Sequence, residues 1–297
     1  MSNNIKEKVT GAINTTGYPV ELSISSTLSD HEHIVWNNKY FFDDEIKKAR
    51  SVDIVSPAFA YAIGEVRYGA EIVIECKKSP QTAWVFFETP TIIQSEYSGQ
   101  IFDFGKYCKG NYDSESLLWK FKQDLSLHYG PKKGLTQAAQ NYQVIRIGEE
   151  DLDDSVRQPK AKDTIFEAAN QVVKYITYNA KSGERNVLNI FVEKGVYPLF
   201  NLYYPIIVYD GPLYNGFLKD EKIELQERDH IVLQHQFMPN YFPKPKTFLI
   251  DVVKKEKFEE LLNTLEKEQD SIAGHIEANV QDFQNLAKPM HVPSWRF

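Results

Sequence analysis

Long hydrophobic runs are missing from this chain of 297 residues, and cysteine is scarce, with only Cys76 and Cys108. Because no apolar segment approaches the length of a membrane-spanning helix, we expect no insertion into a membrane. Two thiols do not make a disulfide framework, so a reducing compartment is the simpler interpretation. The first residues lack the apolar core of a signal peptide, and we therefore expect a cytoplasmic protein.

An excess of positive charge is missing as well, since the formal net charge is −7. This balance argues against a protein that coats nucleic acid through its overall field, although it leaves room for a local basic groove. Hydrophobic residues make up 42% and aromatic residues 13% of the chain. These proportions are typical of a folded globular protein with enough material for a sizeable core.

Alternating helical and strand patterns indicate an α/β protein. Short helices are predicted over residues 2–15 and from Pro19 onward, and the second carries Val20, Leu22, Ile24 and Leu28. We expect a hairpin of strands at 34–42 and 51–56, a connection over 57–70, and a buried strand at 71–78. Further along, we predict a helix at 163–176, strands at 187–192, 204–209, 230–237 and 248–253, and a long C-terminal helix at about 257–286.

The strand at 71–78 is apolar on both faces at its centre, which favours a sheet covered by helices on both sides. We therefore predict one domain spanning residues 1–297, a three-layer α/β/α fold with a mixed central sheet. The stretch at about 89–160 contains many glycines and scattered aromatics. We interpret it as an elaborated insertion with one helix at 114–128, because such long connections often form lids or binding loops.

The most informative residues lie at the ends of two strands. Because side chains alternate along a strand, Glu75 and Lys77 point to one face and Cys76 to the other. Asp53 ends the preceding strand, and pairing of the two strands would bring both carboxylates to one end of the sheet. Two carboxylates with waters suit Mg²⁺ or Mn²⁺, and a lysine beside them can position a water or offset charge on a phosphate. The alternative is a structural ion pair, either Glu75 with Lys77 or Asp53 with Arg50.

The order Val52-Asp53 followed by Ile74-Glu75-Cys76-Lys77 resembles the signature of the restriction-endonuclease-like, or PD-(D/E)XK, nuclease superfamily. The segment Thr16-Gly17-Tyr18-Pro19-Val20-Glu21 is similar to the opening helix of that superfamily, and residues 171–175 are similar to its Gln-Xaa-Xaa-Xaa-Tyr element. The resemblance implies a restriction-endonuclease-like fold and Mg²⁺-dependent or Mn²⁺-dependent cleavage of phosphodiester bonds, with DNA as the expected substrate. It implies that Glu21, Asp53 and Glu75 bind the metal and that Asp53, Glu75 and Lys77 are catalytic. It further implies that Gln171 and Tyr175 contact nucleic acid.

Several other interpretations stay open at this point. Lys78 is a candidate for a phosphate contact, and the charged face of the last helix leaves a homodimer possible. The pair His31 and His33 is expected to be solvated in a polar turn. A member of the same superfamily that has lost catalysis and serves as a nucleic-acid-binding or assembly module is the alternative function. A third hypothesis is a different α/β protein in which the charged pair is structural.

Overall fold

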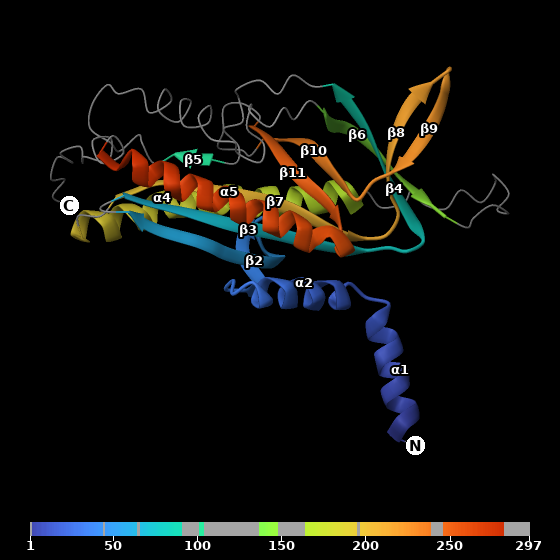
Figure 1. Cartoon of the computed structure of the whole chain (residues 1–297). Helices are drawn as coiled ribbons and strands as arrows, with labels where there is room; N and C mark the ends of the chain where they lie inside the picture. Colours follow the sequence, from blue (N-terminus) through green and yellow to red (C-terminus); the bar gives the residue numbers. More distant parts are fainter. Residues whose placement is uncertain are drawn as a thin grey trace.

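The computed structural model describes residues 2–43, 45–63, 66–90, 101–103, 137–147, 164–194, 197–238 and 246–281. These residues form a mixed α/β fold built on a large mixed β-sheet (Figure 1). Within these ranges, no helix is both long and apolar enough to cross a lipid bilayer.

Two helices open the chain, and a three-stranded antiparallel unit follows them. The helices are α1 (Ser2–Asn14) and α2 (Tyr18–Asp30), and the strands are β1 (Trp36–Asp43), β2 (Lys48–Ile63) and β3 (Val66–Lys78). Pro19 lies in the first turn of α2, where proline is tolerated because that backbone N–H needs no helical partner. Helix α1 extends away from the sheet (Figure 1).

The remaining elements complete the sheet and cover it. They are β4 (Thr82–Pro90), β5 (Ile101–Asp103), β6 (Gln137–Arg146), α4 (Thr164–Lys194), β7 (Tyr197–Asp210), β8 (Leu213–Lys219), β9 (Lys222–Glu227), β10 (His230–Phe237), β11 (Lys246–Lys254) and α5 (Phe258–Ala278), with a 3₁₀ turn at Lys255–Lys257 before α5. The strand order is β1-β2-β3-β7-β11-β10-β6-β4-β8-β9, and β5 pairs with β7 off this path. Strand β3 runs antiparallel to β2 but parallel to β7, which makes the sheet mixed.

Helices pack on both faces of the sheet, as the apolar strand at 71–78 predicted. Helices α2 and α5 share one core cluster with Ile72, Ile74 and Cys76 of β3. Helix α4 shares another cluster with Val73 of the same strand. Because alternate residues of β3 therefore enter opposite clusters, the predicted burial of this strand on both faces is confirmed.

Several predicted elements differ from the observed ones. The strand predicted at 187–192 is wrong, because α4 continues through it to Lys194. A short apolar run carries no periodicity that separates a strand from a buried helix. The connection predicted at 57–70 is also wrong, since β2 and β3 extend through it to Ile63 and from Val66. Leu22 lies outside the buried stripe of α2 and is 65% exposed.

The stretch predicted as an insertion contributes to the central sheet. Strand β6 lies between β4 and β10, antiparallel to the first and parallel to the second. Residues 137–146 are thus part of the central sheet, and the interpretation of the whole stretch as an insertion stays a prediction. The helix expected at 114–128 lies outside the described residues. The last helix, α5, ends at Ala278, earlier than predicted.

Candidate functional site

The end of β3 carries the charged pair that the sequence singled out. Lys77 Nζ donates to Glu75 Oε1 at 2.6 Å, which is the ion pair that the structural alternative expects. Glu75 is 7% exposed, and its second oxygen, Oε2, is buried with no hydrogen-bond partner. Burial, together with the nearby charge of Asp53, raises the pKa of Glu75 to about 7 despite the opposing effect of Lys77. A buried carboxylate oxygen without a partner is costly unless something else binds it.

Asp53 lies beside this pair at a local distortion of β2. Val52 belongs to the cluster under α4, whereas Ile54 belongs to the cluster under α2 and α5, so the alternation of side chains is interrupted at Asp53. Its Oδ2 accepts a hydrogen bond from the backbone N–H of Cys76 at 2.8 Å. The backbone N–H of Asp53 in turn donates to the Glu75 carboxylate. Asp53 and Glu75 are therefore neighbours across the two strands, as the resemblance implied.

Glu21 is brought toward the same place by α2. Three buried residues at spacing four, Val20, Ile24 and Leu28, hold this helix on the sheet and leave Glu21 in its first turn. The pKa of Glu21 is raised by burial first and then by the charge of Asp53, and it is lowered by Lys77. Glu21 is thus within electrostatic range of both residues, and the predicted set of four charged side chains gathers at one end of β3.

Lys77 stays positively charged in these surroundings. Burial lowers its pKa, but the carboxylates of Glu75 and Asp53 outweigh that effect and leave the pKa above its ordinary value. Cys76 points to the other side and packs in the core cluster with α2 and α5, as strand alternation predicted. Its burial and the surrounding carboxylates raise the pKa of the thiol, so it stays protonated and unreactive.

The residues present suit a hard divalent cation that keeps part of its water shell. Within the described ranges, no three His, Cys, Asp or Glu side chains form a closed cluster that could hold a metal ion. Mg²⁺ does not need such a cage, because one or two carboxylates, waters and substrate phosphates commonly complete its coordination. The unpartnered Oε2 of Glu75 and the adjacent carboxylate of Asp53 are the groups that would bind it. Glu21 could reach it through a water.

The three residues expected to contact nucleic acid each have a partner within the protein. Gln171 on α4 donates from Nε2 to the backbone oxygen of Ser51, two residues before Asp53. Tyr175 is 3% exposed and its hydroxyl is hydrogen-bonded with Glu71. Lys78 donates from Nζ to the carbonyl of Asn14 at 2.7 Å, at the end of α1. Gln171 therefore lies beside the candidate site, and nucleic-acid contacts by all three residues stay predictions.

Glu71 is a further charged residue on β3 whose surroundings the sequence did not reveal. It accepts hydrogen bonds from Tyr175 and from Asn179 Nδ2 at 3.1 Å, both on α4. Burial raises its pKa to about 7, against the effects of these donors and of Lys39. The only signal in the sequence is that Glu71 precedes Glu75 by four residues and so faces the same side of the strand.

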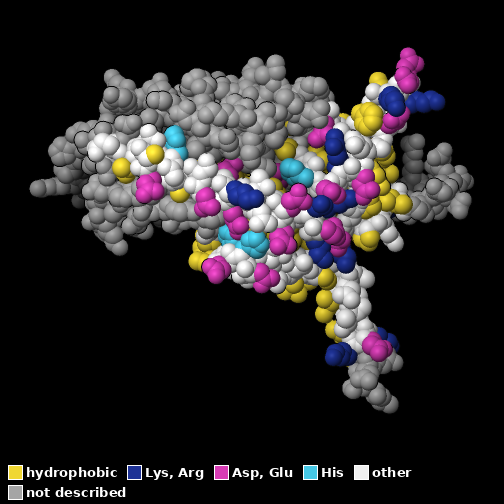
Figure 2. Space-filling model, in the orientation of Figure 1, with side chains coloured by type: hydrophobic (Ala, Val, Ile, Leu, Met, Phe, Trp, Pro, Cys, Tyr) yellow, Lys and Arg dark blue, Asp and Glu magenta, His cyan; other side chains and the backbone are white. Residues whose placement is uncertain are grey.

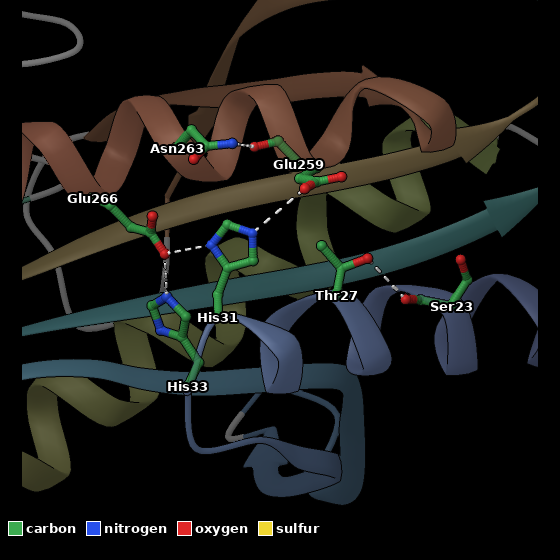
Figure 3. A network of polar contacts seen from close by, with 7 residues as sticks. All are labelled: Ser23, Thr27, His31, His33, Glu259, Asn263 and Glu266. Atoms are coloured by element: carbon green, nitrogen blue, oxygen red, sulfur yellow. Dashed lines mark hydrogen bonds and ion pairs between the residues drawn. The ribbon is translucent and has the colours of Figure 1, made fainter.

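A histidine cluster joins the end of α2 to α5 (Figure 3). His31 Nδ1 and His33 Nε2 both contact Glu266 Oε1 at 2.9 Å, and His31 Nε2 lies 3.7 Å from Glu259. The side chain of His33 is only 4% exposed. The prediction of a solvated pair was therefore wrong, because the carboxylate partner lies 233 residues away in sequence from His33. The cluster fixes the helix that carries Glu21.

Replacing Glu266 by glutamine is expected to lower the melting temperature more at about pH 6 than at about pH 9. The hydrogen bond with Glu266 raises the pKa of His31 above its usual value. The stabilisation by protonated His31 is then fully present below the unfolded-state pKa and is lost as the pH rises through the folded-state pKa. Circular dichroism melts at both pH values measure the effect. Glu259→Gln, which removes only the longer and more exposed contact, is the matched control, and an equal loss at both pH values would contradict the assignment.

Comparisons with known protein families, with curated proteins and with solved structures find no match to this chain. The functional argument therefore depends on the site itself.

Proposed function

We propose that this protein is a restriction-endonuclease-like nuclease that hydrolyses phosphodiester bonds in DNA with Mg²⁺ or Mn²⁺. The observation that carries the proposal is the buried, unpartnered Oε2 of Glu75 with Asp53 and Lys77 around it. A structural ion pair alone would give no reason for leaving a carboxylate oxygen buried without a donor. The resemblance of Asp53, Glu75 and Lys77 to the PD-(D/E)XK signature supports the same proposal.

In this proposal each residue of the site has its own role in the hydrolysis. Asp53 and Glu75 would hold the cation, which would supply Lewis-acid stabilisation of the phosphate and lower the pKa of a water. Lys77 Nζ, already 2.6 Å from Glu75, holds the attacking water by a hydrogen bond and offsets the negative charge that develops on the phosphate. Glu21 orients a water from the side of α2. Gln171 steadies the phosphate backbone by exchanging its bond with Ser51 for one to the nucleic acid.

The test is cleavage of plasmid DNA and of single-stranded DNA with Mg²⁺, with Mn²⁺ and with EDTA. Wild-type protein is expected to cleave only with the divalent ion, and Asp53→Asn is expected to be slower by about a hundredfold, because it removes a charge that acts directly at the reacting centre. Glu71→Gln is the matched control, since Glu71 lies on the same strand and face but contacts α4 residues. Its cleavage rate should stay close to that of the wild type.

The catalytically silent alternative is favoured by one observation, namely that Lys77 is already occupied by Glu75 at 2.6 Å. It predicts that DNA binds but is never cleaved with either metal.

Robust cleavage by Asp53→Asn at the wild-type rate would contradict the site assignment.

A further inference from the structure

The edge of the sheet next to the site carries exposed aromatic residues. Strand β1 is the first strand in the sheet order and pairs only with β2 among the described strands. Trp36 is 42% exposed and Tyr40 is 72% exposed on this strand. Lys39 Nζ lies 4.1 Å from the centroid of the Trp36 ring, which is a cation–π contact. This contact holds the indole in one orientation while leaving much of the residue accessible.

A local distortion of β1 places Trp36 and Lys39 on the same side. Asn38 between them has a φ of 52°, and the β1–β2 ladder omits it. Lys39 pairs with Val52 and Asn37 pairs with Ile54, so the gap in the ladder faces Asp53. The distortions of the two strands thus coincide at Asn38 and Asp53, and Trp36, paired with Val55, lies two residues along the strands from them.

Strand register places this pair on the α4 side of the sheet, the side of Glu75 and Lys77. Phe41 lies two residues after Lys39 and therefore on the same side of the strand. It contacts Tyr175 of α4 and belongs to the cluster under that helix. Tyr40 therefore faces the opposite side. Two strand spacings separate β1 from β3, which is about 10 Å. In register, Trp36 is in line with Val55 and Val73, so a chain that crosses this edge toward Glu75 passes within two residues of Trp36.

The charge of this edge suits a polyanion, in contrast to the rest of the molecule. Lys47, Lys48 and Arg50 are exposed on the hairpin between β1 and β2. The nearby acids Asp43 and Glu45 are both bound by Lys174, at 2.8 Å and 2.7 Å. The face that carries α5 shows many acidic side chains with lysines, arginines and histidines between them (Figure 2). A backbone of phosphates is therefore attracted to the β1 edge and repelled from the α5 face.

We propose that the β1 edge binds single-stranded DNA and leads it into the site, with one unpaired base stacked on Trp36. This inference rests on the proposed nuclease function and specifies its substrate. An exposed indole next to a lysine offers a stacking platform that any unpaired base can use, whereas the bases of a duplex are already stacked on each other. The hairpin carries Lys47, Lys48 and Arg50 against Asp43, Asp44 and Glu45, and Lys174 binds two of these acids, so the local balance is positive.

The test measures binding separately from cleavage. A labelled oligothymidine and a blunt duplex of equal length are titrated with wild-type protein in Ca²⁺, and binding is followed by fluorescence anisotropy. The single strand is expected to bind at least about tenfold more tightly than the duplex, and Trp36→Ala to weaken single-strand binding by about tenfold. Trp36→Phe, which keeps a ring, should restore most of the affinity. Tyr40→Ala removes a more exposed aromatic from the opposite side of the strand and should leave the affinity unchanged.

The inference is overturned if the wild type binds the duplex as tightly as the single strand, if it binds neither, or if Trp36→Ala binds as the wild type does. Circular dichroism melts of each variant show that it is folded, and Lys39→Gln gives a second route to the same loss. Failure of the nuclease proposal is seen separately, as absence of Mg²⁺-dependent cleavage in a protein that still binds the single strand.

Discussion

Replacing Glu75 by glutamine and Lys77 by methionine together is expected to abolish metal-dependent cleavage and to raise the free energy of unfolding. The loss of cleavage follows because the double variant lacks both a metal-binding carboxylate and the ammonium group beside it. Each change removes a charge at the proposed reacting centre, so we expect a combined loss of about a thousandfold or more. This is the largest effect on activity that the site predicts.

The gain in stability follows from the cost of burying the pair. Glu75 is 7% exposed and leaves Oε2 without a partner, and its pKa of about 7 reports that burial disfavours its charged form. Replacing a buried ion pair with well-packed hydrophobic side chains of similar size is often neutral or stabilising, by about 1 to 4 kcal/mol, and glutamine with methionine likewise leaves no buried charge. Glutamine keeps an acceptor for the backbone N–H of Asp53. The double variant should therefore be more stable than the wild type.

Urea unfolding in EDTA measures the free energy of unfolding. It is carried out on the wild type, both single variants and the double variant. Lys77→Met alone should be the least stable at about pH 8, because it leaves the Glu75 carboxylate buried without its cation. If the double variant were less stable than either single variant, the pair would be a stabilising element, and the structural hypothesis would be favoured over the catalytic one.

Replacing Glu71 by glutamine is expected to flatten the dependence of stability on pH. The carboxyl group of Glu71 has a pKa of about 7 in the folded protein against 4.5 as its ordinary value. Between these values the folded state binds more protons than the unfolded state, so stability falls as the pH rises through this range. The raised pKa corresponds to roughly 2 to 3 kcal/mol lost by about pH 8. Glutamine stays neutral, so this loss should disappear.

The free energy of unfolding of the wild type and of Glu71→Gln is compared at about pH 5 and about pH 8, without divalent metal. Glu75 titrates in the same range, but its contribution is common to both proteins and cancels in the difference. Parallel pH profiles for the two proteins would show that Glu71 is not responsible. DNA cleavage by Glu71→Gln, measured alongside, should persist.

The part of the site that follows strand alternation and local helix signals was predictable from sequence. Residues 71–78 have an apolar, β-branched centre bounded by polar residues, and this pattern predicted the buried strand and the sides of Glu75 and Cys76. The helix with Glu21 followed from Pro19 and an apolar spacing of four. Pairing of adjacent strands then sufficed to expect Asp53 near Glu75.

Features that depend on distant partners were not predictable. His31 and His33 look solvated until α5 supplies Glu266, and Glu71 has no visible role until α4 supplies Tyr175 and Asn179. Strands β8 and β9 have no predicted counterpart, and in β9 even the alternating Ile223 and Leu225 are exposed and so mark no core face. In each case the missing information is a contact across the fold that no local pattern encodes.

The edge strand β9 affects whether two copies of this protein can pair through their sheets. Strand β9 ends the sheet opposite β1, and all six of its residues are exposed. Two copies pairing antiparallel through this edge must place residues from the same side of the sheet opposite each other. In the two registers that centre one copy of β9 on the other, either Glu224 faces Glu224 of the second copy or Lys222 faces its Arg228. Like charges at these positions therefore oppose pairing through this edge of the described sheet, and they act against the exposed Ile223 and Leu225, which would favour it.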